Sequence, residues 1–480
     1  MRQLWTYCLI LISVAALFPA TARASSLDKD VDKALAMLPK AATSAVRIVR
    51  LGDAGEAGSV PSVVLDRRGS SPMIPASNLK VVTTAAASAG LGDDYRFETR
   101  LYLRRDEDSG TTDVLVVGGG DPSFGDSALD DDVRRVLDGW AKFLAESGVE
   151  TVGQLLVDDG LFDDTYDHPN WPENQKHLWY EAQVGALNFN LNCVGLSLTR
   201  SGSVMDLKLT PDTDYVDVEG RVKVGKKNAV VATRRLGTNE VVVGGETNAR
   251  EQGPIRVTVD DPTAYFATVF AEALVDAGVA VSQVARLPRA PLDDWQLAAV
   301  HETPMSVVLA RTNEDSINLY AEAFIKLLGH QATGEPGSWQ NGGEAVLAYL
   351  RSLGVDTTGL FLDDGSGMSR LNQMTAEALT AALADRHASP GHAAYRTALS
   401  DAGSDGTLRS RFRDQPSLHG RIWGKTGYIR GVSTMSGLLQ TEDGDWYAIS
   451  VLVNDCPRAD IWRAKAAQEA VFAAVDKHSP

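Results

Sequence analysis

The sequence predicts an α/β (α+β) fold in which one antiparallel sheet, flanked by helices, is built from both ends of the chain. Three observations predict it. Strand-like runs stand next to a helical run at each end of the 480 residues, and a long middle segment has its own strands and helices. Strands from the two ends can share a sheet that the adjacent helices cover. The middle is then a large insertion, and 44% apolar residues suffice for two or three domains.

The first 24 residues are typical of a cleaved secretory signal. Arg2 precedes an apolar run from Leu9 to Phe18, and the small-residue site Ala22-Arg23-Ala24 stands before Ser25. The alternative is a membrane anchor, but the run is too short to span about 30 Å of hydrocarbon. We therefore expect an exported, periplasmic chain with no transmembrane segment after cleavage. Peripheral contact with a membrane stays open.

The elements next to the chain ends follow from periodicity and turn residues. Residues 27–38 have helical spacing, and the β-rich runs 45–51 and 62–65 follow on either side of a Gly-rich turn. Near the other end, the β-rich runs 432–439 and 446–453 precede a helical run at 460–475. We expect these strands to form one sheet, with the two helices packed on its face.

The insertion has a mixed pattern followed by a β-rich one. A strand at 114–117 precedes the turn 118–122, and a second strand is expected at 154–157. The stretch 187–243 consists of short alternating runs, and Asp261-Pro262 opens a helix at 263–277. Between the first two strands, we expect an amphipathic helix that ends at Gly148. Its apolar face would be formed by Val133, Val136, Leu137, Trp140, Phe143 and Leu144.

Charge and cysteine content limit the partners. The formal net charge is −17, and removing the signal takes away two arginines and no acid, which leaves −19. A nucleic-acid partner would require clustered cations, so we expect none. Cys193 and Cys456 remain in the mature chain and could pair or stay as two buried thiols; the sequence leaves both open. His387 and His392 have no metal-ligand spacing, so no metal or other cofactor is expected.

A serine and a lysine three residues apart open an apolar helix. Ser77 and Lys80 would lie on one helix face, so the amine can reach the hydroxyl. Burial and a second nearby cation would lower the pKa of Lys80 and let it take the serine proton. Alone, this spacing is weak evidence, because a helix-capping serine followed by a solvated lysine gives it equally well.

Two further motifs follow in a fixed order. Ser316-Ile317-Asn318 opens a helix, and Gly424-Lys425-Thr426-Gly427 leads through Tyr428 and a turn into the strand 432–439. Taken separately, Ser316 could be a helix cap and Lys425 an edge-strand charge. Together, the order S-x-x-K, S-x-N, K-T-G is the set of serine β-lactamases and penicillin-binding proteins.

With these motifs the chain resembles the D-Ala-D-Ala carboxypeptidases/endopeptidases of the low-molecular-mass class C penicillin-binding proteins. The resemblance covers nearly all of the mature chain, including the long gap between Ser77 and Ser316, which β-lactamases lack. It also includes the motifs Gly119-Gly120-Asp121-Pro122, Asp158-Asp159 with Phe162-Asp163, Asp364-Gly365-Ser366-Gly367-Met368-Ser369-Arg370 and Asp405-Gly406-Thr407-Leu408-Arg409.

The resemblance implies a serine β-lactamase/transpeptidase-like domain that carries a large insertion of two smaller domains. The expected division is a signal peptide at 1–24, a discontinuous catalytic domain at 25–96 and 298–480, an inserted α/β domain at 97–186 and 255–297, and a small β-rich domain at 187–254.

The resemblance also implies the roles of the site residues in cleaving peptidoglycan stem peptides and in binding β-lactams covalently. Ser77 would be the nucleophile, Lys80 its proton acceptor and Ser316 a proton relay to the leaving amine. The substrate-binding residues would be Asn318, Lys425, Thr426, Gly427, Tyr428 and Arg370, with the backbone N–H groups of Ser77 and Tyr428 as the oxyanion hole. The strand after Lys425, at 432–439, would pair with the substrate backbone as an added strand.

Some points stay open. Arg370 could meet an anionic group of the peptide or form a structural ion pair. Ile317 stands where the family usually has Asp or Asn, and we expect it to change packing rather than activity. The alternatives are a β-lactamase or esterase of the same fold, and a non-catalytic penicillin-recognising sensor. The sequence does not separate carboxypeptidase from endopeptidase activity.

Overall fold

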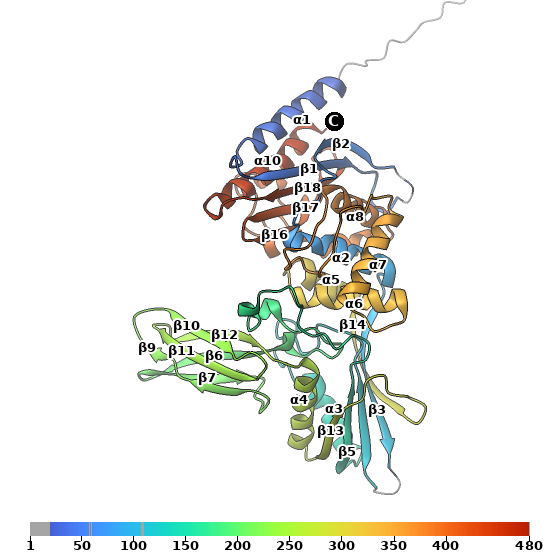
Figure 1. Cartoon of the computed structure of the whole chain (residues 1–480), viewed down its shortest axis with the longest axis vertical. Coiled ribbons are helices and arrows are strands. Elements are labelled where there is room, and N and C mark those ends of the chain that lie inside the picture. The colour runs from blue at the N-terminus through green and yellow to red at the C-terminus, as the bar shows by residue number, and fades with distance from the viewer. Residues whose placement is uncertain (1–19, 57, 59, 107–109, 480) are drawn as a thin grey trace, which may run out of the picture.

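The computed structural model describes residues 20–56, 58, 60–106 and 110–479 of the chain (Figure 1). The apolar run of the expected signal lies outside these residues. The expected cleavage site falls within the first turns of helix α1 (Ala20–Leu35). The described strands form three sheets, and the molecule is elongated, with the first sheet at one end (Figure 1).

The first sheet joins the two ends of the chain, as predicted. Its strands, in spatial order, are β15 (Ser400–Asp401), β16 (Ile422–Ile429), β17 (Val432–Gln440), β18 (Trp446–Asn454), β1 (Thr43–Arg50) and β2 (Ser62–Arg67). All of its pairings are antiparallel, and β1 pairs with β18 along its whole length. Both central strands, β17 and β18, consist almost wholly of buried residues, as expected for strands covered on two faces.

Helices cover both faces of this sheet. On one face, α1 packs beside α10 (Ile461–His478), and Val31 and Val471 share a cluster with Ile48 of β1 and Ile449 of β18. On the other face lie the helices that carry or support the site (Figure 1). They are α2 (Lys80–Leu91), α5 (Met305–Asn313), α6 (Asn318–Thr333), α7 (Trp339–Ser352), α8 (Ala376–Ala388) and α9 (His392–Thr397).

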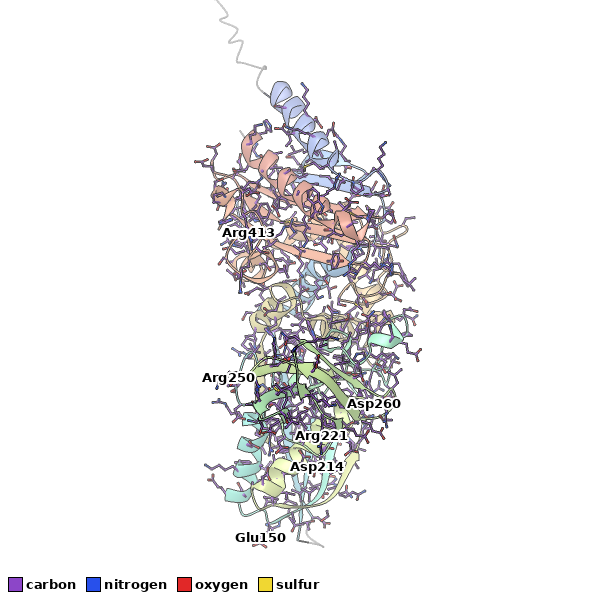
Figure 2. The ribbon with its side chains drawn as sticks, turned by 90° about the vertical axis from the view of Figure 1, so that its left-hand side faces the viewer. Glu150, Asp214, Arg221, Arg250, Asp260 and Arg413 are labelled. Carbon is purple, nitrogen blue, oxygen red and sulfur yellow. The ribbon has the colours of Figure 1, made fainter. Side chains whose placement is uncertain are left out.

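The other two sheets belong to the inserted segment. The five-stranded sheet has the order β13 (Ala280–Arg286), β5 (Thr151–Asp158), β4 (Thr112–Val117), β3 (Arg96–Arg105) and β14 (Gln296–Pro304), with α3 (Arg135–Glu146) and α4 (Pro262–Asp276) packed on it. The seven-stranded sheet contains β6 (Cys193–Ser201), β7 (Val204–Thr210), β8 (Asp217–Gly220), β9 (Lys223–Val224), β10 (Ala229–Arg234), β11 (Glu240–Thr247) and β12 (Glu251–Thr258). In Figure 2, Arg413 marks the first sheet's end of the molecule, Arg221 and Arg250 the seven-stranded sheet, and Glu150 the far end of the five-stranded one.

Several expected details of the insertion differ in the structure. Phe143 is 41% exposed rather than on the buried face of α3, and Val133 is buried but precedes the first helical residue. The expected boundary at 297/298 falls inside β14, which pairs with β3, and the one at 254/255 falls inside β12, which pairs with β6. Both strands return to a sheet formed mainly by earlier strands, and a composition change along the chain does not reveal such pairing.

The cysteines that the sequence left open are both free and buried, Cys193 among residues of the insertion and Cys456 against the C-terminal helix. The cluster around Cys193 also contains Phe162 and Val184 of the insertion together with Leu79 and Phe324 of the helical layer. The insertion and the helices therefore share one core. Over the described ranges, we find no helix that is both long and apolar enough to cross a membrane.

Candidate active site

Ser77 and Lys80 stand at the junction of a short 3-10 helix and a buried α-helix. The 3-10 helix spans Ala76–Leu79, and α2 begins at Lys80. Small residues follow in α2, so this helix packs closely and every side chain from Lys80 to Ser88 is buried. Ala76 has φ +49°, a conformation that residues other than glycine rarely adopt, and it turns the chain just before Ser77. Lys80 Nζ lies 3.4 Å from Ser77 Oγ, so the two side chains meet as predicted.

The Lys80 amine has two other partners, both neutral. Nζ donates to Asn318 Oδ1 at 2.6 Å and to the backbone oxygen of Ser366 at 3.3 Å. An uncharged amine has two N–H groups and one lone pair. If the N–H groups donate to Asn318 and Ser366, the lone pair faces Ser77 Oγ. This is the arrangement that a proton acceptor for the serine hydroxyl requires.

Burial sets the proton affinity of Lys80. The side chain is fully buried, and burial lowers the pKa of Lys80 to about 8, while the carboxyl groups of Glu322 and Asp364 act in the opposite direction. Lys425 is also fully buried, and burial together with the positive charge of Lys80 holds its pKa well below the usual value. The charge of Lys80 thus acts on the pKa of Lys425, where burial is the larger cause.

Ser316 is held by the third motif. Lys425 Nζ donates to Ser316 Oγ at 2.8 Å. Ser316 has φ +61° and stands before the N-cap of α6, which is Ile317, so it is not the helix cap that its sequence also allowed. Ile317 is 7% exposed and packs in the core, away from these polar groups. The Arg311 backbone oxygen accepts a hydrogen bond from Ile317 N at 3.2 Å and fixes the turn.

The insertion reaches the site directly. Asn318 Nδ2 donates to the backbone oxygen of Tyr180 at 2.7 Å, in the short 3-10 helix Trp179–Glu181. Asp126, also in the insertion, accepts from Arg311 Nη2 at 2.8 Å and from the hydroxyl of Tyr320 at 2.7 Å. Sequence patterns do not reveal these contacts, because they join residues that are more than 130 positions apart.

The K-T-G motif lies within a strand rather than ahead of one. Lys425, Thr426 and Gly427 belong to β16, and β17 hydrogen-bonds β16 on one side and β18 on the other. The expectation that the strand 432–439 adds the substrate as a further strand is therefore wrong, since β17 has no free edge. β15 pairs with Trp423 and Gly424, and none of the described strands pairs with the edge of β16 from Lys425 to Ile429.

Gly427 has a packing reason to be glycine. A Cβ at this position would stand 2.3 Å from Thr434 Oγ1, 2.6 Å from the Pro75 backbone oxygen and 2.8 Å from Asn78 N. The absence of a side chain therefore lets β16 approach the turn that carries Ser77. Thr434 Oγ1 donates to the same Pro75 oxygen at 2.6 Å and ties β17 to that turn.

Two predicted binding residues lie at the exposed rim of the site. Tyr428 is 52% exposed at the free edge of β16. Arg370 is exposed, and its Nη1 donates to the backbone oxygen of Arg430 at 2.8 Å. This contact links the loop that carries Arg370 to the turn between β16 and β17. The role of Arg370 toward a substrate stays a prediction.

A buried carboxyl group behind Lys80 was not predicted from the sequence. Glu322 stands one helical turn after Asn318 on α6, is fully buried, and accepts from the backbone N–H groups of Gly365 and Ser366. The four-residue spacing from Asn318 was a signal that could have revealed it. Over the described ranges, no group of three or more His, Cys, Asp or Glu side chains is placed to hold a metal ion.

Comparison with known proteins gives consistent matches over most of the chain. A family model described as "D-Ala-D-Ala carboxypeptidase 3 (S13) family" matches residues 27–475. A D-alanyl-D-alanine carboxypeptidase of Actinomadura sp. (strain R39) is 34% identical over 81% of this chain and 74% of its own length. The D-alanyl-D-alanine carboxypeptidase DacB of Haemophilus influenzae is 25% identical, over 83% and 84% of the two chains.

Solved structures give the same fold. The crystal structure of penicillin binding protein 4 from Haemophilus influenzae superposes with a TM-score of 0.76 at 22% identity, over 93% of this chain and 99% of that one. A second structure of that protein, in complex with a β-lactam, gives a TM-score of 0.71 at 23% identity, over 94% and 100% of the two chains. The fold class predicted from the sequence is thereby confirmed.

Proposed function

The chain belongs to the D-Ala-D-Ala carboxypeptidase 3 (S13) family, and we propose that Ser77 and Lys80 are its nucleophile and proton acceptor. It is a serine-type D-Ala-D-Ala peptidase of the low-molecular-mass class C penicillin-binding proteins, acting on peptidoglycan. The observation that carries the proposed roles is the environment of Lys80. Its fully buried amine lies 3.4 Å from Ser77 Oγ, and its two other hydrogen-bond partners are neutral.

The proposed acylation step moves one proton. Lys80 takes the hydroxyl proton of Ser77 while Oγ forms a bond to the carbonyl carbon between the two terminal D-alanines of a stem peptide. The backbone N–H groups of Ser77 and Tyr428 stabilise the oxyanion. The N–H of Ser77 is in the first turn of a helix, where N–H groups have no partner within the helix. The C–N bond then breaks, and the leaving amine carries away a proton.

In this proposal, the proton that Lys80 took from Ser77 passes to the leaving amine through the Ser316 hydroxyl, and Lys425 positions that hydroxyl. The hydrogen bond of 2.8 Å between Lys425 Nζ and Ser316 Oγ supports a relay through the Ser316 hydroxyl. Lys425 and Thr426 also hold the terminal carboxylate of the peptide. Water then hydrolyses the ester on Ser77 and frees the enzyme.

The substrate backbone pairs with the free edge of β16 in this proposal. The edge from Lys425 to Ile429 pairs with no strand in the described part of the chain, and it lies beside the turn that carries Ser77. An extended peptide can pair with such an edge through its main chain. Asn318 binds the peptide amide, and Arg370 at the rim meets an anionic group of the stem.

Export to the periplasm by a cleaved signal of 24 residues completes the proposal. The supporting observations are the signal-like composition of residues 1–24 and the cell-wall substrate of the family. We also propose that the division into a discontinuous catalytic domain and two inserted domains follows the three sheets. Mass spectrometry of the N-terminus of the exported protein tests the cleavage.

A fluorescent penicillin tests the nucleophile. It should label the purified protein covalently, with the adduct on the peptide that contains Ser77. Ser77→Ala should abolish both the labelling and the release of D-alanine. A conservative change at an exposed serine of α7, Ser352→Ala, should leave both in place, since the Ser352 hydroxyl donates only to the Tyr349 backbone oxygen among the described residues. D-alanine release by the Ser77 variant at the rate of the unaltered protein would refute the mechanism.

Digestion of purified muropeptides tests the substrate class. Loss of the terminal D-alanine reports carboxypeptidase activity, and cleavage of cross-linked dimers reports endopeptidase activity. Turnover of penicillin in the same samples separates a peptidase, which stays acylated, from a β-lactamase of the same fold. Rapid release of hydrolysed penicillin without muropeptide cleavage would refute the proposed substrate.

A further inference from the structure

The loop that contributes the Ser366 oxygen is anchored on one buried carboxyl group. Glu322 Oε1 accepts from Ser366 N at 2.9 Å, and Oε2 accepts from Gly365 N at 2.8 Å and from Trp339 Nε1 at 2.9 Å. Three N–H donors therefore converge on a side chain that is fully buried. None of these contacts belongs to the motifs that define the proposed mechanism.

The anchored residue Ser366 is the one whose backbone oxygen faces Lys80. Ser366 donates its N–H to Glu322 and its backbone oxygen accepts from Lys80 Nζ at 3.3 Å. Asn318 accepts the other N–H of the amine, and it stands four residues before Glu322 on the same face of α6. One helix face thus fixes both acceptors of Lys80, one directly and one through the loop.

The rest of the loop depends on the same anchor. Thr83 of α2 donates to the Gly365 oxygen at 2.7 Å, so the loop lies between α2 and α6. At Gly367, which has φ +83°, a Cβ would stand 1.9 Å from the Ala76 oxygen. Without the glycine at this point, the loop could not lie against the turn that carries Ser77. A displacement of the Gly365-Ser366 peptide would therefore move both partners of the proposed acylation step.

From this geometry we infer that Glu322 is a positioning residue for the proton acceptor. It holds the N–H of Ser366, and thereby places the backbone oxygen of the same residue to accept one N–H of Lys80, which directs the amine lone pair at Ser77 Oγ. The inference rests on the proposed function of Lys80 and names the group that orients it. Glu322 acts through Ser366 and does not touch the reacting atoms.

The charge of Glu322 has a second effect. Glu322 and Asp364 oppose the effect of burial on the pKa of Lys80, and burial followed by the charge of Asp364 raises the pKa of Glu322 to about 7. The charged groups that face this pair are Asp364 from the loop, Lys326 from α6 and Lys425 from β16. Removing the Glu322 charge should therefore lower the pKa of Lys80. In a plot of the acylation rate constant against pH, the rise that follows deprotonation of Lys80, its acid limb, should then move to lower pH.

The test measures the second-order rate constant of acylation by a fluorescent penicillin between pH 5 and pH 10, with melting curves at each pH. In Glu322→Gln the side chain loses its charge and one of its two acceptor oxygens. We expect the rate constant to fall by about 10- to 100-fold. We also expect the midpoint of the acid limb to fall by about one pH unit. A purely structural role would lower the melting temperature and leave the midpoint where it is.

A second variant separates position from charge. Glu322→Asp keeps the charge but is one methylene shorter, so it cannot reach the loop N–H groups. Acylation should slow by at least about tenfold while the midpoint stays within about 0.3 pH units of the unaltered protein. The matched control is Glu469→Gln on α10, where the carboxyl group pairs with Arg411. This control should keep the rate constant and the midpoint.

Two outcomes would overturn the inference. One is a Glu322→Gln variant that keeps both the rate constant and the midpoint. The other has three parts. In Glu322→Gln the acylation rate constant falls only in proportion to the fraction of unfolded protein, the pH midpoint does not move, and Glu322→Asp is acylated at the rate of the unaltered protein. Failure of the unaltered protein to be acylated at all would instead refute the proposed function.

Discussion

Lys80 on α2 and Lys326 on α6 are both fully buried, yet their surroundings differ in one respect. Lys326 Nζ contacts a carboxyl group, Asp163 Oδ1, at 2.7 Å, together with the Thr165 oxygen at 2.7 Å and the Trp339 ring at 4.1 Å. Lys80 Nζ contacts only the neutral oxygens of Ser77, Asn318 and Ser366 among the residues that the structure describes.

The difference separates a structural cation from a proton acceptor. Burial lowers the pKa of both lysines, but at Lys326 the adjacent Asp163 opposes that effect through charge and a hydrogen bond. At Lys80 the opposing charges of Glu322 and Asp364 act through space, without contact to Nζ. A buried amine with neutral partners can release and take up a proton without leaving a carboxylate unpaired, whereas the paired amine cannot.

The largest effect is expected when Lys80 is removed. Lys80→Met keeps a similar volume in the core but has no proton acceptor. Acylation by a fluorescent penicillin should slow by about 10²- to 10⁴-fold, which is the usual contribution of a general base. Stopped-flow labelling measures this rate. The melting temperature should fall less than in Lys326→Met, and the opposite order would contradict the distinction between the two lysines.

The pH dependence of acylation in the unaltered protein should also identify Lys80, rather than Lys326, as the proton acceptor. The expected change in rate is somewhat smaller than that caused by removing Lys80. Only the uncharged form of Lys80 accepts a proton, so a pKa of about 8 limits the reaction below that pH. Acylation should therefore rise about tenfold per pH unit up to roughly pH 8 and then level off. A rate constant measured across pH 5 to 10 gives the midpoint. A midpoint near pH 10, or one that Lys326→Met shifts, would contradict the comparison.

The smallest effect on turnover is expected at Lys326. Lys326→Met leaves Asp163 without its partner, and because Asp163 is 30% exposed we expect a loss of about 2 kcal/mol rather than the larger cost of a fully buried pair. Melting and urea unfolding measure the loss, and the acylation rate of the folded fraction should stay within about twofold.

A double-mutant cycle provides the control for this prediction. Asp163→Asn alone should also destabilise the protein, and the Lys326→Met/Asp163→Asn pair should cost less than the two single changes combined. Strict additivity would show that the ion pair contributes nothing. A large loss of acylation in folded Lys326→Met would show that this lysine is not merely structural.

The fold was predictable where neighbouring residues decide it. The helix at 263–277 was expected from Asp261-Pro262, and in the structure the Asp261 side chain caps α4 by accepting from Ala264 N. The β-rich runs 432–439 and 446–453 were expected to be strands, and they are the buried strands β17 and β18. Phe143 was misplaced because helical spacing assigns it to the apolar face, while the packed neighbours leave that position exposed.

The three motifs of the site were readable for the same reason, since each is local in sequence. The spacing of Ser77 and Lys80 already places them on one face of a helix turn. Glu322 and Tyr180 were not readable in this way. One acts through a loop more than 40 residues later, and the other reaches Asn318 from an insertion 138 residues earlier.

The sequence by itself determined the local elements, the order of the motifs and the residues that can carry the chemistry. Only the tertiary structure decided the environment of each charge. In the folded chain, Lys326 contacts the Asp163 carboxyl group, whereas Lys80 contacts neutral oxygens. The free edge near the site belongs to β16 rather than to β17. The physical reason is that hydrogen bonding and desolvation depend on which distant segments exclude water from a group, and local spacing does not encode that choice.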